Sequence, residues 1–258
     1  MIDLASLVKQ YPQELSGFKR NILAEYLQCR VLSSIFESEY SGKLVFMGGT
    51  AIRLCHDSRR FSEDLDFDNR GMQKNDFMRI SEKAVSMLAL EGYAPECDFS
   101  FKGAFRCFIK IPGLYYKHAL SGHEGEKLLL QIDAESQGVD YEVRTSVINR
   151  LGVFARVTAP TPAVLLSMKI TALLGRKREK GRDFYDVTFL SGITAPDYNY
   201  LMKKAGIKNS MELKEVLLKK ISRLNMKSLA ADVSPFLFSK SDEQRVIHFE
   251  EFIREMKA

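Results

Sequence analysis

An apolar run that ends in two glycines and leads into an acidic alternation constrains this chain more than any other feature. Residues 46–69 read FMGGTAIRLCHDSRRFSEDLDFDN, in which three aspartates occupy alternate positions, Asp64, Asp66 and Asp68. Carboxylates this close repel one another, and they are costly to desolvate unless a cation joins them. The stretch therefore predicts a strand whose acidic face binds a cation.

The alternation assigns the side chains of this strand to two faces. Asp64 and Asp66 project side by side, while Leu65 and Phe67 turn toward the core. Two carboxylates in this arrangement offer the oxygen ligands that Mg²⁺ prefers, with Mn²⁺ as an alternative ion. A solvated edge strand is the ordinary alternative. We expect Asp68, near the strand end, to be solvated.

The glycine pair predicts a phosphate-binding bend between a buried strand at 44–47 and a helix that begins near residue 51. Backbone N–H groups at Gly48 and Gly49 can approach an anion closely, and the Thr50 hydroxyl adds a donor. The glycine bend could bind a triphosphate, and the acidic strand could bind the metal ion that accompanies it. Together they predict phosphoryl or nucleotidyl transfer from an NTP.

A third carboxylate is expected from a second strand, LLLQIDAES. Leu128, Leu130 and Ile132 would face the core, so that Asp133 and Glu135 lie on the opposite face. Asp133 would complete the metal site or accept the proton of an attacking hydroxyl. An ordinary strand-end acid is the alternative.

The order of elements predicts an α+β fold in two parts. Before residue 157 we expect helices at 17–41 and 74–91 and strands at 44–47, 64–68, 105–111 and 127–134. After the pair Pro160 and Pro162, helical periods dominate, at 163–176, 182–191, 211–224 and 242–256. Residues 1–157 should form a mixed β-sheet core flanked by helices, and residues 158–258 a helical C-terminal subdomain.

The helical part carries a lysine and two acids of interest. Lys169 lies on an apolar helix stripe, so it either extends to solvent or meets a buried anion. In a cleft it would suit a nucleotide phosphate. Asp183 and Asp186 share a helix face, and salt bridges with Lys169 or Arg182 are the structural alternative. The basic cluster around them is a solvated helix end or a guide for triphosphate or RNA; it comprises Arg176, Lys177, Arg178, Lys180 and Arg182.

Composition narrows the class of protein. The 258 residues are 45% hydrophobic and 28% charged, as in a globular core-forming chain, and the net charge of +5 favours anionic partners. No stretch reaches the roughly 18 apolar residues of a membrane helix, and the N-terminus lacks a signal-peptide pattern. We therefore expect a cytoplasmic protein without a membrane partner. The four cysteines form no CxxC pair and are expected to be free thiols.

Three blocks in the same order resemble the AbiEii/AbiGii toxin family of nucleotidyltransferases, within the DNA polymerase β-like superfamily. They are KLVFMGGTAIRL, RRFSEDLDF and LLSMKITALLGRKREKGRDFYDV, and the resemblance spans residues 18–190. It implies a nucleotidyltransferase fold with Mg²⁺-dependent transfer of NMP from an NTP to RNA, often tRNA, or to a protein. It also implies the toxin of a bacterial two-gene system, restrained by a cognate antitoxin.

The resemblance also assigns roles to individual residues. It implies metal ligation by Asp64 and Asp66, with Asp133 as a looser match for a third ligand. The nucleotide-binding set comprises Gly48, Gly49, Thr50, Ser62, Lys169 and Arg182. The catalytic set comprises Asp64, Asp66, Asp133, Lys169, Asp183 and Asp186.

Two other functions stay open at the level of the sequence. A phosphotransferase on the same scaffold would move the γ-phosphoryl group, and it needs the same cradle and metal. A non-catalytic module would bind RNA or a protein through an inactive site, although the intact acids speak against it.

Overall fold

The computed structural model describes residues 1–256, and the chain divides into two compact units. Unit 1 consists of Met1–His56, Phe61–Gln137 and Arg144–Ala159. Unit 2 consists of Asp57–Arg60, Gly138–Val143 and Pro160–Ala258. The division expected at residue 157 stays a prediction, since two short segments from earlier in the chain belong to unit 2.

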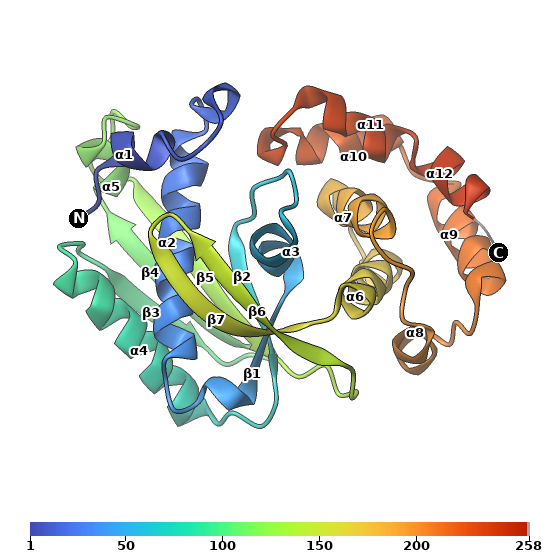
Figure 1. The fold of residues 1–258 in the computed structure, drawn as a ribbon, viewed down its shortest axis with the longest axis horizontal. Helices are drawn as coiled ribbons and strands as arrows, with labels where there is room; N and C mark the ends of the chain where they lie inside the picture. Colours follow the sequence, from blue (N-terminus) through green and yellow to red (C-terminus); the bar gives the residue numbers. More distant parts are fainter. Residues whose placement is uncertain (257–258) are drawn as a thin grey trace. The chain divides into compact units, whose positions relative to one another are not determined.

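Unit 1 is built on a five-stranded mixed sheet (Figure 1). Its strands lie in the order β1-β2-β5-β4-β3, with β2 and β5 parallel and the other neighbouring pairs antiparallel. They span β1 Leu44–Met47, β2 Asp64–Asn69, β3 Glu96–Ser100, β4 Phe105–Pro112 and β5 Lys127–Glu135. The parallel contact between β2 and β5 brings two acidic strands together in the middle of the sheet.

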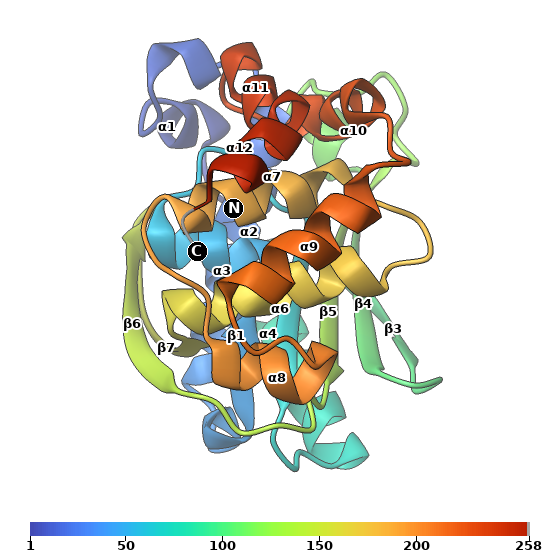
Figure 2. The same cartoon turned by 90° about the vertical axis from the view of Figure 1, so that its right-hand side faces the viewer.

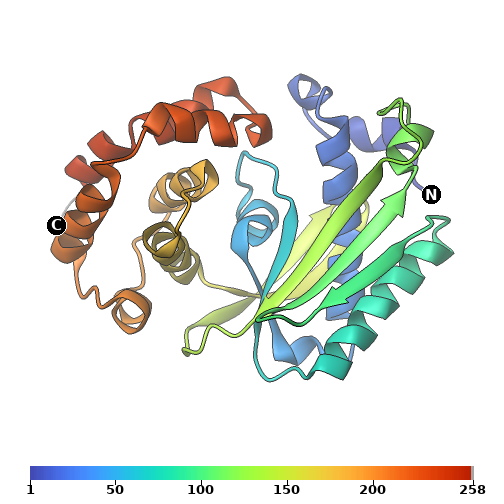
Figure 3. The same ribbon diagram turned by 180° about the vertical axis from the view of Figure 1, so that it is seen from behind.

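Two long helices pack together against one face of this sheet, α2 Lys19–Phe36 and α4 Lys74–Leu90 (Figure 1). Leu128, Leu130 and Ile132 of β5 are buried, whereas alternate residues of that strand keep part of their exposure. Figure 3 shows the sheet from its other side. The acidic side chains of β2 and β5 therefore lie on the face opposite the long helices.

The rest of unit 1 consists of short helices and a hairpin. The hairpin turns at Leu151-Gly152, where both residues have positive φ, as a tight two-residue turn requires. Its Arg150 donates a hydrogen bond to Glu25 of α2. These elements span α1 Leu4–Val8, η1 Gln13–Leu15, η2 Ser41–Lys43, α3 Gly48–His56, α5 Leu114–Lys117, β6 Val143–Arg150 and β7 Val153–Pro160.

Unit 2 is helical (Figure 2). Its segment Asp57–Arg60 joins the helices through a bridge between Arg60 and Leu237, and the Phe238 amide donates to the Arg59 carbonyl. The elements span α6 Pro162–Gly175, α7 Gly181–Ser191, α8 Tyr198–Ala205, α9 Ser210–Ile221, α10 Met226–Val233, η3 Ser234–Phe236, η4 Lys240–Glu243, α11 Gln244–Ile247 and α12 Phe249–Glu255.

The α+β fold class and the strands at 44–47 and 64–68 are confirmed. The sequence reading missed β3, the β6–β7 hairpin, α8 and α10. It was wrong at 242–256, where one expected helix is three short helices that pack around the buried side chains of Val246, Phe249 and Ile253. In residues 1–256 no helix combines the length and the apolar character needed to cross a membrane.

Candidate active site

The glycine bend lies directly against an acidic side chain. Gly48 is the first residue of α3 and has a φ of 78°, and the preceding Met47 pairs with Asp66 of β2. A methyl group on Gly48 would lie 2.1 Å from Oδ2 of Asp66. Both the left-handed backbone and this close approach require glycine. The first helical turn and the Asp66 carboxylate therefore form one local structure.

Thr50 ties the same bend to the start of the acidic strand. Its side chain is fully buried, and its hydroxyl donates a hydrogen bond to the backbone carbonyl of Asp64. We expected this hydroxyl to be a donor to phosphate, but in the structure its proton goes to the protein backbone. Thr50 thus fixes where Asp64 begins β2.

A third carboxylate stands next to Asp66. In the parallel pair, Asp66 lies opposite Asp133 and Asp64 lies opposite Gln131, so the three aspartates share one face. Oδ2 of Asp133 accepts a hydrogen bond of 2.9 Å from Gln131. Nε of Arg106 is 3.4 Å from Oδ1 but is not aligned for a hydrogen bond, so this contact is an ion pair alone.

This arrangement leaves Oδ1 of Asp133 buried and without a hydrogen bond in the described chain. A buried carboxylate oxygen without a hydrogen bond is costly, and the ion pair with Arg106 offsets part of that cost, whereas direct coordination of a metal ion would offset more of it. Across residues 1–256, no group of three or more His, Cys, Asp or Glu residues has an arrangement that could hold a metal ion. The oxygen donors fit a Mg²⁺ ion bound by one or two carboxylates, with water and phosphate oxygens completing its shell.

Asp68 corrects one sequence-based expectation. It is buried, with 3% of its surface exposed, and not solvated. Its Oδ1 accepts a hydrogen bond of 2.7 Å from the Gln137 amide, and Arg70 lies 3.3 Å from Oδ2. The third member of the alternation therefore anchors the chain that leaves β5, which alternation alone does not reveal.

A buried glutamine holds the approach to the acidic strand. The side-chain amide of Gln28, on α2, donates to the Ser62 carbonyl at 2.9 Å and to the Glu63 carbonyl at 2.8 Å. Gln28 is 1% exposed. These two bonds fix the backbone immediately before Asp64. The signal for this contact in the sequence is a polar residue, Gln28, on the buried stripe of the helix.

A buried carboxylate likewise holds α3. Glu25 of α2 accepts hydrogen bonds from Arg53 of α3 at 2.8 Å, from Arg150 at 3.0 Å and from the Tyr11 hydroxyl at 2.8 Å. Burial and the nearby Glu25 raise the pKa of Tyr11 well above its ordinary value, so the phenol keeps its proton. The helix that begins at the glycine bend is thus clamped to α2.

The lysine and the two acids of the helical part meet within unit 2. Lys169 of α6 is 9% exposed, and its Nζ lies 2.8 Å from Oδ2 of Asp186 and 3.4 Å from Oδ1 of Asp183. The lysine therefore meets buried anions, which was the structural alternative for these residues. Both aspartates come from α7, where their spacing puts them on one face.

Arg60 joins this cluster, and our sequence reading missed it. Its guanidinium makes a bidentate contact with Asp186 at 2.7 and 2.6 Å, and both side chains are buried. Burial alone would raise the pKa of Asp186, but Arg60 and Lys169 outweigh it and hold that pKa below its usual value. Nε of Arg176 lies 2.6 Å from Oδ2 of Asp183 without hydrogen-bond alignment.

The expected site residues thus form two groups in two units. Unit 1 brings together the glycine bend, Asp64, Asp66 and Asp133, with Ser62 two residues before β2. Unit 2 brings together Lys169, Asp183 and Asp186, with Arg182 in the first turn of α7. A single site that contains both groups stays a prediction.

Comparisons with known proteins agree with this architecture. A family model described as the nucleotidyl transferase AbiEii toxin of a type IV toxin–antitoxin system matches residues 30–252. The chain is similar to the crystal structure of JHP933 from Helicobacter pylori, at 16% identity and a TM-score of 0.53 over 92% of both chains. It is also similar to a candidate nucleotidyltransferase from H. pylori, at 15% identity and a TM-score of 0.55 over 92% of this chain and 95% of that one. No curated protein matches.

Fold and family together define a nucleotidyltransferase, an enzyme that passes a nucleotidyl group from a nucleotide substrate to an acceptor. Within that class, the chain belongs to the AbiEii family, the nucleotidyl transferase toxins of type IV toxin–antitoxin systems.

Proposed function

We propose that this protein transfers NMP from an NTP to an RNA acceptor, such as tRNA, with Mg²⁺ as the metal. One observation carries the proposal: the Asp66 carboxylate lies between the Gly48 bend and the neighbouring Asp133. A phosphate-binding backbone and adjacent carboxylates are the two components that an in-line displacement at phosphorus requires.

In unit 1, the backbone N–H groups of the Gly48-Gly49-Thr50 turn bind the β- and γ-phosphates at the start of α3. Asp64 and Asp66 hold the metal, and Oδ1 of Asp133 is available to it as a further ligand. When bound, Mg²⁺ would neutralise the charge that develops on the phosphates and on the leaving pyrophosphate. The Thr50 hydroxyl fixes the Asp64 backbone, which keeps the first ligand in place.

The acceptor hydroxyl oxygen forms a bond to the α-phosphorus, and the bond from that phosphorus to the bridging oxygen of pyrophosphate breaks. The hydroxyl proton must leave as that oxygen attacks, and a carboxylate within the site is the base that accepts it. Asp133 is our candidate for this base when it is not a metal ligand. Replacement by Asn separates the two roles: loss of the ligand weakens Mg²⁺ binding, whereas loss of the base changes the pH profile.

For unit 2, we propose that Lys169 neutralises phosphate charge, with Asp183 and Asp186 holding its ammonium group in position. Two carboxylates within 3.4 Å support this role. The Ser62 hydroxyl and the Arg182 guanidinium are the remaining groups that we assign to nucleotide contacts. Both residues are half-buried, beside Asp64 and Asp183 respectively.

The family supports one further part of the proposal, a protein partner. A type IV toxin–antitoxin family implies a cognate antitoxin protein as a partner. We propose that the enzyme acts in the cytoplasm, where NTPs and RNA acceptors are present, and that no membrane partner is needed.

The test uses purified protein, total cellular RNA and each α-³²P-NTP in turn, with γ-³²P-ATP in parallel. We expect α-label, but not γ-label, to enter RNA of defined size in the presence of Mg²⁺, and EDTA to abolish the transfer. Transfer of γ-label alone would establish a phosphotransferase instead. RNA binding without transfer of either label would contradict the proposal and favour a non-catalytic module.

A further inference from the structure

Unit 2 carries a concentration of exposed cations that the proposed chemistry does not use. We name it the basic ridge and define it by Lys177, Arg178, Lys219, Arg223 and Lys227. All five side chains are exposed, and in the described part of the chain none of them has an ion-pair partner. Arg178 and Lys177 belong to the basic cluster singled out in the sequence, whereas the other three come from the end of α9, the loop after it and the start of α10.

Contacts inside unit 2 fix the three segments of the ridge side by side (Figure 2). Lys220 of α9 lies 3.0 Å from Glu179 and donates to the Arg176 carbonyl at 3.4 Å. The Gly181 amide donates to Asp232 of α10 at 2.9 Å. A methyl group on Gly181 would lie 1.9 Å from the Leu229 carbonyl oxygen, so α7 begins in tight contact with α10. The cations are therefore held on a stable surface.

Two acids beside the ridge, Glu179 and Asp232, are already engaged. Glu179 pairs with Lys220, and Asp232 accepts the Gly181 amide. Neither neutralises the five cations of the ridge. Like charges on one surface repel, and an anionic partner relieves that repulsion.

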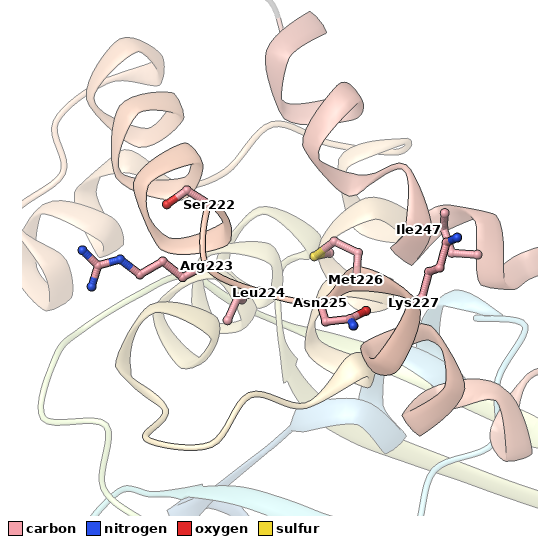
Figure 4. A pocket seen from close by; sticks show the side chains of 7 residues that line it. All are labelled: Ser222, Arg223, Leu224, Asn225, Met226, Lys227 and Ile247. Carbon is pink, nitrogen blue, oxygen red and sulfur yellow. The ribbon is translucent and has the colours of Figure 1, made fainter.

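A hollow of about 610 Å³ lies within the ridge (Figure 4). Every residue that lines it keeps partial or full exposure, and the lining comprises Ser222, Arg223, Leu224 and Asn225, Met226 and Lys227 at the start of α10, and Ile247 of α11. The Asn225 side chain caps α10 by accepting from the Ser228 amide. A small ligand needs buried polar groups that converge on it. Exposed, dispersed cations instead suit a long polyanion whose phosphates contact them one by one.

We infer that the basic ridge binds the sugar-phosphate backbone of the RNA acceptor, without reading its sequence. This inference rests on the proposed transfer to RNA, for which it supplies a docking surface. RNA is favoured over an acidic protein because the ridge is dominated by separated cations, whereas protein interfaces need a buried apolar centre. The cations attract the polymer electrostatically, so the affinity must fall steeply with salt.

The experiment compares three forms of the full chain. The ridge variant carries Lys177→Gln, Arg223→Gln and Lys227→Gln. The control variant carries Lys83→Gln, Lys102→Gln and Lys117→Gln, three exposed lysines of unit 1, so the net charge changes equally. Thermal unfolding verifies that both variants fold. Fluorescence anisotropy then measures binding of a labelled mixed-sequence single-stranded RNA and of bulk tRNA. The titrations contain EDTA and no NTP and are repeated between about 50 and 300 mM salt.

Loss of three phosphate contacts should reduce the slope of log K against log salt by about 2, since each single-strand contact contributes ~0.7. At 100 mM salt the ridge variant should bind RNA at least about tenfold more weakly than the wild type, and the control variant should bind within about twofold. Equal RNA affinity and equal slope in all three forms would overturn the inference. The inference would also be overturned if the ridge variant kept the RNA affinity of the wild type but no longer bound the antitoxin protein.

Transfer assays on the same forms separate this inference from the proposed function. If wild type labels RNA and the ridge variant does so with an unchanged KM, the ridge inference fails and the transfer stands. If no form labels RNA but the ridge variant alone loses RNA binding, the ridge stands and the proposed transfer fails.

Discussion

The acidic strands of unit 1 and the ion cluster of unit 2 contain the same side chains in opposite settings. In unit 1, Asp66 and Asp133 stand side by side on a half-exposed sheet face, and one Asp133 oxygen lacks a hydrogen bond in the described residues. In unit 2, Asp186 is fully buried between Arg60 and Lys169, and both of its oxygens are occupied. A carboxylate that contacts one arginine at 3.4 Å and keeps an oxygen without a hydrogen bond differs from a carboxylate held between two buried cations.

This difference predicts what each group does when it is altered. A half-exposed carboxylate with spare acceptor capacity contributes to binding and chemistry, and its removal costs little stability. A buried ion pair costs stability when one partner is lost, because the other charge is left in a low-dielectric interior. Measurements of both activity and stability on variants from each unit therefore test the comparison directly.

The largest effect is expected from the acidic strand. Asp66→Asn removes a proposed metal ligand beside Gly48, and transfer should fall by about 10²–10³-fold or more, as for loss of a direct electrostatic stabiliser of the transition state. The melting temperature should stay within a few degrees of wild type, since the amide fills the same space. Incorporation of α-³²P-NMP into RNA and thermal unfolding provide the two measurements.

Glu135→Gln is the matched control for this variant. Glu135 lies on the same face of β5 as Asp133 but is exposed at the strand end. Its replacement should leave transfer within about twofold of wild type, since an exposed charge is screened by solvent. Equal loss of activity in the two variants would remove the distinction between a specific site and a generally acidic face.

Substitutions in the buried ion cluster of unit 2 should mainly lower the stability of the protein. Arg60→Met leaves Asp186 with Lys169 as its remaining charge partner, and the free energy of unfolding should fall by ~3–5 kcal/mol. Urea unfolding followed by circular dichroism measures the change. The double variant Arg60→Met with Asp186→Leu should recover much of the loss, because it removes both charges. A double variant at least as unstable as the sum of the two single variants would contradict this account.

The glycine bend tests the junction between backbone and site. Gly48→Ala must accommodate a positive φ and a methyl group 2.1 Å from Asp66, so the carboxylate has to move. We expect a loss of ~1–2 kcal/mol from the left-handed backbone and a fall in transfer of at least tenfold from the displaced ligand. Chemical unfolding and the transfer assay report the two effects separately.

Gly152→Ala provides a control with similar backbone strain. Gly152 has a φ of 72°, but a methyl group there would meet nothing within 4 Å. The stability loss should be similar, and transfer should be unchanged. If Gly48→Ala retained full activity, close contact between the bend and Asp66 would have no functional importance.

Local patterns in the sequence were sufficient for the elements that hold the site in unit 1. The apolar run, the glycine pair and the acidic alternation each act within a few residues, and they predict β1, the bend and β2. The alternation in LLLQIDAES placed Asp133 on the polar face of an expected neighbouring strand, but it did not predict that Asp133 lies opposite Asp66. The parallel register of the two strands depends on contacts between residues more than 60 positions apart, which no local pattern contains.

Partners distant in sequence explain the failures. Local sequence predicts that Asp68 is a solvated strand-end acid, whereas in the structure it accepts a hydrogen bond from the Gln137 amide, 69 positions away in the sequence. Arg60 lies in a loop of ordinary polar residues, and Asp186, its partner, follows 126 positions later. The hairpin strand β6 contains several polar residues, so its strand character comes from pairing with β7. In each case tertiary contact, and not local propensity, determines the structure.

The smallest effect tests a residue that supports the site from behind. Gln28→Leu removes the donors to the Ser62 and Glu63 carbonyls while keeping a similar volume, and the loss of two part-buried hydrogen bonds should cost ~1–3 kcal/mol of stability. Because these bonds fix the backbone before Asp64, the apparent Mg²⁺ requirement should rise several-fold while the KM for NTP changes little. Gln28→Glu is the companion variant. It keeps the shape of the side chain but places carboxylate oxygens against the Ser62 and Glu63 carbonyl oxygens, so it should lower stability and raise the Mg²⁺ requirement more than Gln28→Leu does. A merely structural role would lower stability in both variants without changing the Mg²⁺ titration, and that result would limit Gln28 to packing.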